Sequence, residues 1–274
     1  MAIPNVLSLA GTDPSGGAGI QADLKAFAAH GAYGMSAITA VVAQNTQGVR
    51  GFVALEPSFV HDQLAAVFDD VRVDAVKIGM VANAEITLAI VAALDRYASC
   101  PVVLDPVMVA KSGHHLLDAS AVAAVRSELL PRCTLITPNL PEASVLLGLE
   151  SEISGLDEMR LRAPELLALG SSWVLLKGGH LSSDVSVDIL HGASTTEFSA
   201  ARVVTSNDHG TGCTLSASIA ALLPRMDMVT AVGAAKDYLT EALRRSSELT
   251  VGSGHGPVHH FHAMWDAFAE AGAL

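Results

Sequence analysis

The most informative stretch of the chain is Asn207–Ser218, which reads Asn-Asp-His-Gly-Thr-Gly-Cys-Thr-Leu-Ser-Ala-Ser. A turn of small residues, Gly210 to Gly212, leads into Cys213 and then into helix-forming residues up to Leu223. The first N–H groups of a helix have no partner within it, and the helix dipole adds partial positive charge there. The stretch therefore predicts either an ordinary turn before a buried helix or an anion site suited to phosphate.

Polar and reactive residues crowd this turn, which favours the anion site. His209, Thr211 and Cys213 stand close together at the start of an otherwise apolar helix. A cysteine at a helix N-terminus is expected to have a lowered thiol pKa, so that it can act as a base or a nucleophile. The hypothesis is an anion hole with a reactive thiol inside it.

The composition is typical of a globular α/β protein. Of the 274 residues, 50% are hydrophobic, 16% are charged and only 4% are aromatic, which favours helices packed on a sheet around a large core. A formal net charge of −12 argues against nucleic acid as a partner, although a small phosphorylated ligand needs only a local site. Three widely spaced cysteines predict neither a disulfide framework nor a zinc cluster.

Targeting and membrane signals are not evident in the sequence. The N-terminus lacks the pattern of a signal peptide, and no apolar run reaches the length of a membrane span. We therefore expect a cytoplasmic protein with no membrane partner.

Strands and helices alternate for most of the chain, which is typical of a mainly parallel sheet with helices on both faces. With no repeat or linker in the sequence, we expect one domain over residues 1–274. The predicted strands are Asn5–Ala10, Met35–Val42, Asp74–Ile78, Pro101–Leu104, Leu135–Thr137 and Trp173–Lys177, followed by an antiparallel pair, Val187–Leu190 and Glu197–Thr205.

Three polar residues stand where a ligand could reach them. Asp23 lies at the edge of an apolar helix stripe, so it is either satisfied by neighbouring protein or free to bind a ligand. Gln44 and Asp105 follow strands. In open α/β sheets the ligand crevice lies beyond the carboxyl ends of strands, which favours ligand contacts there.

Asn139 and Glu142 have the spacing of a helix capping box, but they could equally serve Mg²⁺ or a phosphate, and both roles can hold at once. Lys177 ends a strand before two glycines that would let a ligand approach the backbone. Lys236, taken alone, is interpreted as a surface residue. The C-terminal histidines, His255, His259, His260 and His262, fit no zinc spacing and are interpreted as non-catalytic.

Six motifs occur in a specific order, and together they closely resemble the hydroxymethylpyrimidine/phosphomethylpyrimidine kinases, the thiamine-pathway members of the ribokinase-like superfamily. The resemblance runs from end to end and includes Gly254–Phe261. The motifs are Gly11–Asp23, Gln44–Gly48, Lys77–Met80, Thr137–Glu142, Lys177–His180 and His209–Cys213.

This resemblance implies a three-layer α/β/α ribokinase-like fold that uses ATP with Mg²⁺. It implies phosphorylation of 4-amino-5-hydroxymethyl-2-methylpyrimidine, and then of the monophosphate to the diphosphate, in thiamine diphosphate biosynthesis. It also implies small-molecule partners only, and a homodimer.

Carried over position by position, the resemblance assigns four groups of residues. The pyrimidine pocket is expected at Gly11, Asp23, Gln44, Met80 and Val107. The nucleotide is expected at Asn139, Lys177, His209 and Lys236, and the metal at Asp105 and Glu142. The anion hole is expected at Gly210, Thr211 and Gly212, with Cys213 as the base. His114 departs from the pattern, because many relatives have an acid there.

Two other functions remain open. A pyridoxal kinase of the same superfamily would phosphorylate a hydroxymethyl group on a pyridine ring and would stop at the monophosphate. A catalytically silent pyrimidine-binding protein would bind its ligand without consuming ATP.

Overall fold

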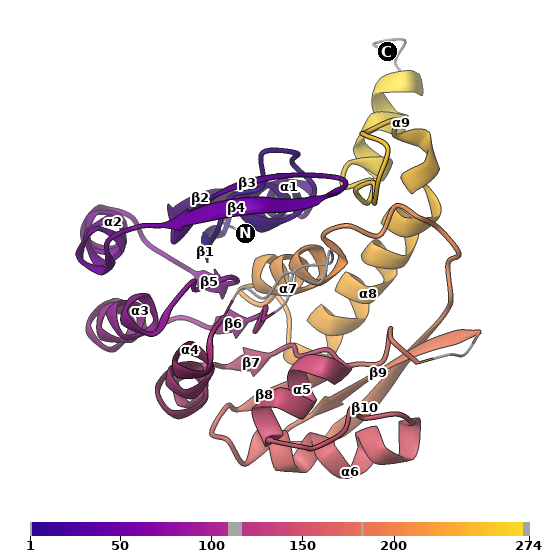
Figure 1. Cartoon of the computed structure of the whole chain (residues 1–274). Helices are drawn as coiled ribbons and strands as arrows, with labels where there is room; N and C mark the ends of the chain where they lie inside the picture. The colour runs from indigo at the N-terminus through magenta and orange to yellow at the C-terminus, as the bar shows by residue number, and fades with distance from the viewer. Residues whose placement is uncertain (1, 109–116, 182–183, 271–274) are drawn as a thin grey trace.

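The computed structural model describes residues 2–108, 117–181 and 184–270, so His114 lies outside the described residues. An eight-stranded sheet has the order β10-β9-β8-β7-β6-β5-β1-β2 (Figure 1). All neighbouring strands are parallel except that β9 is antiparallel to β8 and β10, as predicted for the last two strands. The strands are β1 (Asn5–Ala10), β2 (Tyr33–Ile38), β5 (Ala75–Ile78), β6 (Val102–Leu104), β7 (Leu135–Ile136), β8 (Trp173–Lys177), β9 (Val185–His191) and β10 (Thr195–Ala201).

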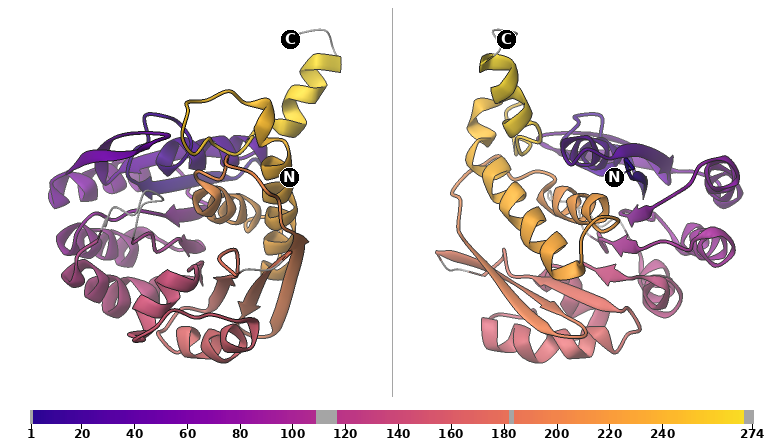
Figure 2. Two further views of the ribbon diagram at one scale, coloured as in Figure 1. Left: turned by 45° about the vertical axis from the view of Figure 1, so that its right-hand side comes forward. Right: turned by 180° about the vertical axis from the view of Figure 1, so that it is seen from behind.

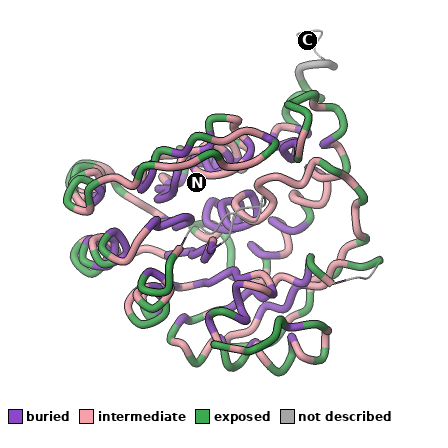
Figure 3. Tube along the Cα trace, in the orientation of Figure 1, coloured by how far each residue is buried: buried purple, intermediate pink, exposed green. Residues whose placement is uncertain are grey.

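Helices cover both faces of this sheet, because alternate strand residues are apolar on both sides. Val6 belongs to one buried cluster and its neighbour Leu7 to the other, and burial is concentrated between the layers (Figure 3). The predicted three-layer α/β/α fold is confirmed. One face carries α1 (Gly19–Ala29), α7 (Thr211–Leu222) and α8 (Met228–Arg244); the other carries α2 (Pro57–Asp70), α3 (Ala84–Tyr97), α4 (Ala119–Ala124), α5 (Leu140–Leu147) and α6 (Leu156–Leu167).

The single strand predicted over Met35–Val42 is wrong in its extent. The chain forms β2 in the main sheet and then β3 (Ala40–Asn45), which pairs with β4 (Gly48–Ala54) in a separate two-stranded sheet. Thr39 separates them: its N–H donates to Ala10 O and its hydroxyl donates to Met80 O. These two bonds direct the chain away from the sheet edge, and Gln44 lies near the end of β3 in the hairpin.

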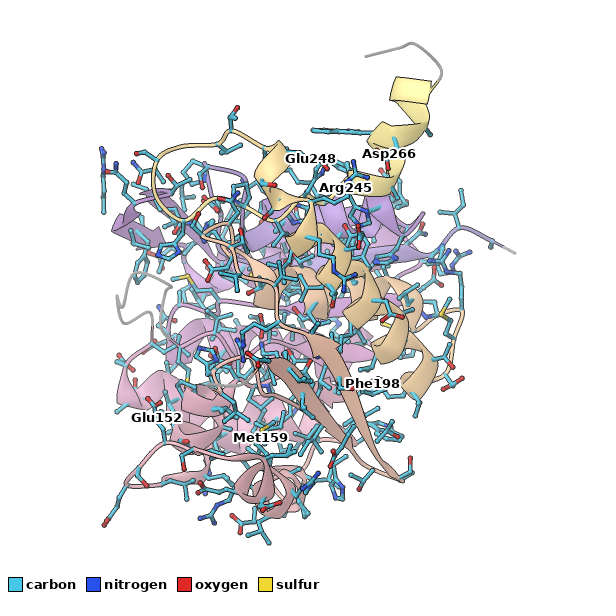
Figure 4. All side chains as sticks on the ribbon, turned by 90° about the vertical axis from the view of Figure 1, so that its right-hand side faces the viewer. Glu152, Met159, Phe198, Arg245, Glu248 and Asp266 are labelled. Atoms are coloured by element: carbon cyan, nitrogen blue, oxygen red, sulfur yellow. The ribbon has the colours of Figure 1, made fainter. Side chains whose placement is uncertain are left out.

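The C-terminal helix α9 (His262–Glu270) extends from the body of the molecule (Figure 2). Arg245, just after α8, holds it through a charged bond to Asp266 and also pairs with Glu248, and the three side chains lie together in Figure 4. Among the described residues, none of the helices has both the length and the apolar character needed to cross a membrane.

Candidate active site

A cavity of about 750 Å³ lies at the carboxyl ends of β1, β5 and β6, where the strand order reverses. Such reversal points are where open α/β sheets bind ligands. Most of the residues predicted for the site line this one cavity: Gln44, Met80, Asp105, Val107, Asn139, Glu142, Lys177, His209, Gly210, Thr211, Gly212 and Cys213.

The turn before α7 needs its glycines. Gly210 has φ +79°, and a Cβ there would lie 1.8 Å from Gly17 O. A Cβ on Gly212 would lie 3.1 Å from Oδ2 of Asp105 and 3.3 Å from Nζ of Lys177. The N-terminus of α7 can therefore pack against the loop after β1 and approach the charged wall of the cavity, with its first-turn N–H groups at the cavity surface.

Cys213 lines the cavity, but its expected low pKa is not found. Burial raises the pKa of the thiol to about 11, with smaller contributions from the carboxylates of Asp23 and Asp105. The Lys77 ammonium and the Gly19 backbone amide act in the opposite direction. The low pKa was predicted only from the position of the cysteine at a helix N-terminus. In the structure, desolvation of the thiolate has the largest effect on this pKa.

Opposite the turn, Lys177 Nζ lies 2.8 Å from Oδ1 of Asp105, and Thr137 donates to the same oxygen over 3.2 Å. Burial raises the pKa of Glu142 to about 7, and Asp105 adds to this while Lys177 opposes it. Oδ2 of Asp105 faces Gly212. The two carboxylates thus share one wall of the cavity with a lysine beside them.

Asn139 and Glu142 form the predicted capping box of α5. Asn139 Oδ1 accepts from the Glu142 N–H over 2.8 Å, and Glu142 Oε2 accepts from the Asn139 N–H over 2.8 Å. Both residues also line the cavity. The capping role is therefore present. It leaves the role in binding Mg²⁺ or phosphate open, because the Glu142 carboxylate has further lone pairs.

Residues at the other end of the cavity come from the hairpin and from two strand ends. Gln44 stands at the tip of β3, while Met80 and Val107 follow β5 and β6. Gly11 does not line the cavity; it lies behind Met80, since a Cβ on Gly11 would lie 3.1 Å from Met80 Sδ. This end of the cavity combines an amide with apolar surface.

Asp23 is not among the cavity-lining residues. Its carboxylate is 0% exposed, accepts from Ser8 Oγ over 2.6 Å and lies 2.9 Å from Lys77 Nζ. Of the two interpretations of the sequence, an acid satisfied by neighbouring protein is the one that these contacts match. Both of these hydrogen bonds are made to Oδ2; Oδ1 has no hydrogen-bond partner among the described residues, but it is buried and Asp23 does not line the cavity.

Lys236 is buried rather than on the surface, and it too is absent from the cavity wall. Its Nζ lies 2.6 Å from Oδ2 of Asp188, whose Oδ1 accepts from the Gly178 N–H over 2.9 Å. Lys236 therefore acts on the glycine turn after Lys177 through Asp188. The interpretation as a surface residue is wrong, because α8 packs against β10 and Lys236 is buried in an ion pair with Asp188 of β9.

Sequence reasoning did not identify three residues that line or hold the site, Asp13, Lys77 and His255. Lys77 lines the cavity while being 0% exposed, and Asp13 holds His209 from the loop after β1. The C-terminal segment reaches the rim, where His255 pairs with Asp208 at 2.9 Å and its N–H donates to Thr46 O. Asp13, Lys77 and His255 lie in the quoted motifs, but spacing alone does not show which side chains pair.

The parallel sheet, the helix N-terminus at its carboxyl edge and the lysine–carboxylate wall define a small-molecule kinase of the ribokinase-like class. The sequence model of the phosphomethylpyrimidine kinase family matches residues 13–259. The chain belongs to this family.

Individual relatives agree with this membership. The hydroxymethylpyrimidine/phosphomethylpyrimidine kinase of Escherichia coli is 54% identical over 263 residues, which cover 95% of this chain and 98% of that protein. The crystal structure of phosphomethylpyrimidine kinase from Clostridium difficile is 43% identical with a TM-score of 0.77, covering 88% of this chain and 99% of that one. The ADP complex of Bacillus subtilis pyridoxal kinase is 33% identical with a TM-score of 0.87, covering 96% and 100%.

Proposed function

We propose that this protein transfers the γ-phosphoryl group of ATP to 4-amino-5-hydroxymethyl-2-methylpyrimidine, and then transfers a second phosphoryl group to the monophosphate. The observation that carries the proposal is that one cavity is lined by Cys213 and the glycine turn together with Gln44, Asp105 and Glu142. The 54% identity to a hydroxymethylpyrimidine/phosphomethylpyrimidine kinase supports the choice of substrate.

The nucleotide occupies the side of the cavity formed by Asn139, Lys177 and His209. The Lys177 ammonium neutralises phosphate charge, and the N–H groups of Thr211 and Gly212 donate to the transferring phosphoryl oxygens. Fixed donors of this kind stabilise charge that develops in the transition state, and phosphoryl transfer depends mainly on such positioning.

Asp105 and Glu142 are the residues that would hold Mg²⁺. Magnesium is bound through one or two carboxylates together with phosphates and water, and two carboxylates in one wall fit this requirement. Within the described residues, no cluster of three His, Cys, Asp or Glu side chains is placed to hold a metal by itself. When bound, the ion neutralises charge on the phosphates.

The pyrimidine occupies the other end of the cavity. The Gln44 amide can donate to a ring nitrogen and accept from the exocyclic amine, while Met80 and Val107 cover the apolar ring faces. This places the hydroxymethyl group toward Cys213 and the nucleotide.

In the first reaction the hydroxymethyl proton passes to Cys213 in its thiolate form, as the new O–P bond forms and the bond from phosphorus to ADP breaks. The thiolate is the minor form near neutral pH, because the pKa of this thiol is raised to about 11. The thiol returns the proton to solvent after the products leave. In the second reaction the acceptor is an anionic phosphate, so Cys213 has no proton to remove and the anion hole carries the step.

A second candidate is pyridoxal phosphorylation, favoured by the TM-score of 0.87 to a pyridoxal kinase. The two activities separate by product. Purified protein is incubated with Mg·ATP and hydroxymethylpyrimidine or pyridoxal, and the products are resolved by mass. A monophosphate followed by a diphosphate supports the proposal; a monophosphate alone, with faster turnover of pyridoxal, favours the second candidate. Pyrimidine binding without ATP consumption would indicate a silent binding protein.

The chain is proposed to act as one kinase domain. It is also proposed to form a homodimer, in which two copies pair through the outer faces of their β3–β4 hairpins. Val41 and Val53 oppose each other across the hairpin and are 51% and 69% exposed, which is unusual for neighbouring valines on a strand pair. Sedimentation velocity tests this: Val53→Glu should shift a dimer to monomers, and a wild-type monomer would contradict it.

A further inference from the structure

A buried ion pair lies beneath the cavity: its lysine lines the cavity, whereas its carboxylate does not. Lys77 on β5 and Asp23 on α1 are both 0% exposed and lie 2.9 Å apart, with Ser8 Oγ bonded to the same carboxylate. Desolvating two charges largely cancels their attraction, so a pair like this contributes little net stability. Its presence next to a catalytic cavity therefore calls for another role.

Lys77 and Cys213 lie on elements that are in contact, because α7, which carries Cys213, packs against β5, which carries Lys77. Both residues line the cavity, together with Gly79, where a Cβ would lie 2.9 Å from Lys77 Nζ. Gly79 thus leaves room for the ammonium at the cavity floor, and Asp23 holds it there from below.

The charged groups that act on the thiol come from four elements besides α7. They are Asp23 on α1, Lys77 on β5, Asp105 after β6 and Lys177 at the end of β8. Lys177 donates to Asp105 over 2.8 Å, so these two charges largely offset each other. Lys77 has the largest favourable charge effect on the thiolate, opposed by Asp23 and Asp105.

We propose that Lys77 is a positioning residue whose ammonium, held by Asp23, stabilises the thiolate of Cys213 and so makes this base available for the first phosphorylation. The inference rests on the proposed function and deepens it. In a water-poor site an opposite charge nearby offsets much of the cost of desolvating a thiolate. Asp23 then acts on catalysis through Lys77, because it holds the ammonium in place. Its own negative charge partly opposes the stabilisation of the thiolate by Lys77.

Alkylation of Cys213 by iodoacetamide, without ATP or substrate, measures this directly. The modified peptide is quantified by mass spectrometry, so Cys100 in the same sample serves as an internal control. Below the thiol pKa the rate is proportional to the thiolate fraction, and at about pH 8 Lys77→Met should slow Cys213 alkylation roughly tenfold. Asp23→Asn should accelerate it, and Cys100 should not change in either variant.

The expected changes in alkylation rate have opposite signs in Lys77→Met and Asp23→Asn, which separates an electrostatic effect from damage to the fold. Loosening of the structure would expose the thiol and accelerate alkylation in both variants, whereas loss of the ammonium slows it. An unchanged or faster rate in Lys77→Met overturns the proposal. Where Lys77→Met does not fold, the double variant Asp23→Asn/Lys77→Met removes both charges and leaves no unpaired carboxylate, and it should still react more slowly than wild type.

The outcome is independent of the proposed function. If Lys77→Met slows alkylation but the wild-type protein does not phosphorylate hydroxymethylpyrimidine, the effect of Lys77 on the thiol is supported and the proposed kinase activity is contradicted. If the wild-type protein phosphorylates hydroxymethylpyrimidine and Lys77→Met is alkylated at the wild-type rate, only the role of Lys77 is contradicted.

Discussion

His209 Nε2 lies 2.8 Å from Oδ2 of Asp13, a residue 196 positions earlier in the chain. The same oxygen accepts from the backbone N–H of Ala18 over 2.7 Å, and Oδ1 accepts from Ser15. One buried carboxylate thus fixes the loop after β1 to the turn before α7, and the shape of the anion hole depends on it.

Asp13→Ala is expected to lower the free energy of unfolding by about 2–4 kcal/mol, because several buried donors lose their acceptor. Burial raises the pKa of Asp13, but hydrogen bonds from His209 and Ser15 outweigh this and hold it well below its usual value. The stabilisation is therefore present above the unfolded pKa and is lost as the pH falls. Urea titration checks the loss, with the exposed Asp69→Ala as a control that should be neutral.

Gly212→Ala should impair catalysis without weakening the fold. The added methyl group would stand 3.1 Å from Asp105 Oδ2 and 3.3 Å from Lys177 Nζ, where the phosphoryl group is expected. Alanine is favoured in helices, which offsets part of the cost of these close contacts, so the melting temperature should change little, while kcat/KM for ATP should drop at least about tenfold. Gly51→Ala, with nothing within 4 Å of its Cβ, is the matched control. Equal activity in the two variants would remove this turn from the nucleotide site.

Gln44→Ala should raise the KM for hydroxymethylpyrimidine by roughly 10- to 100-fold, because the ring loses a bidentate partner. The KM for ATP should stay within about twofold, since Asn139 and Lys177 lie on the other side of the cavity. Arg50→Ala on the same hairpin is exposed and should behave as wild type. A parallel rise in both KM values would mean that the hairpin shapes the whole cavity rather than contacting the pyrimidine.

Binding of Mg·ATP should release a proton from Glu142 under mildly acidic conditions. Its pKa is raised to about 7, so the carboxyl is protonated below that pH and must lose its proton to become a ligand. Calorimetry in buffers of different ionisation enthalpy should show more proton release near pH 6 than near pH 8. Glu142→Gln should lose this excess, whereas the exposed Glu85→Gln should keep it. Identical proton release in wild type and Glu142→Gln would exclude Glu142 as a metal ligand.

Much of the architecture follows from the sequence, because apolar strands and amphipathic helices leave few other arrangements. The β3–β4 hairpin does not, since β2 and β3 form one apolar run and only the tertiary bonds of Thr39 divide it. The ordered motifs bring most site residues to one cavity. Spacing did not reveal that Asp23 pairs with Lys77, because the two are 54 positions apart, nor that burial dominates the pKa of Cys213.

The central claim is that Cys213 serves as the base in the first phosphorylation only, within an anion hole made of backbone. Single-turnover rates of both phosphorylations are compared for wild type and Cys213→Ala at saturating Mg·ATP. The first rate should fall by about 100-fold or more, and the second should change only a few-fold, because its acceptor is already anionic. Equal losses in the two steps would contradict the assignment of Cys213 as the base.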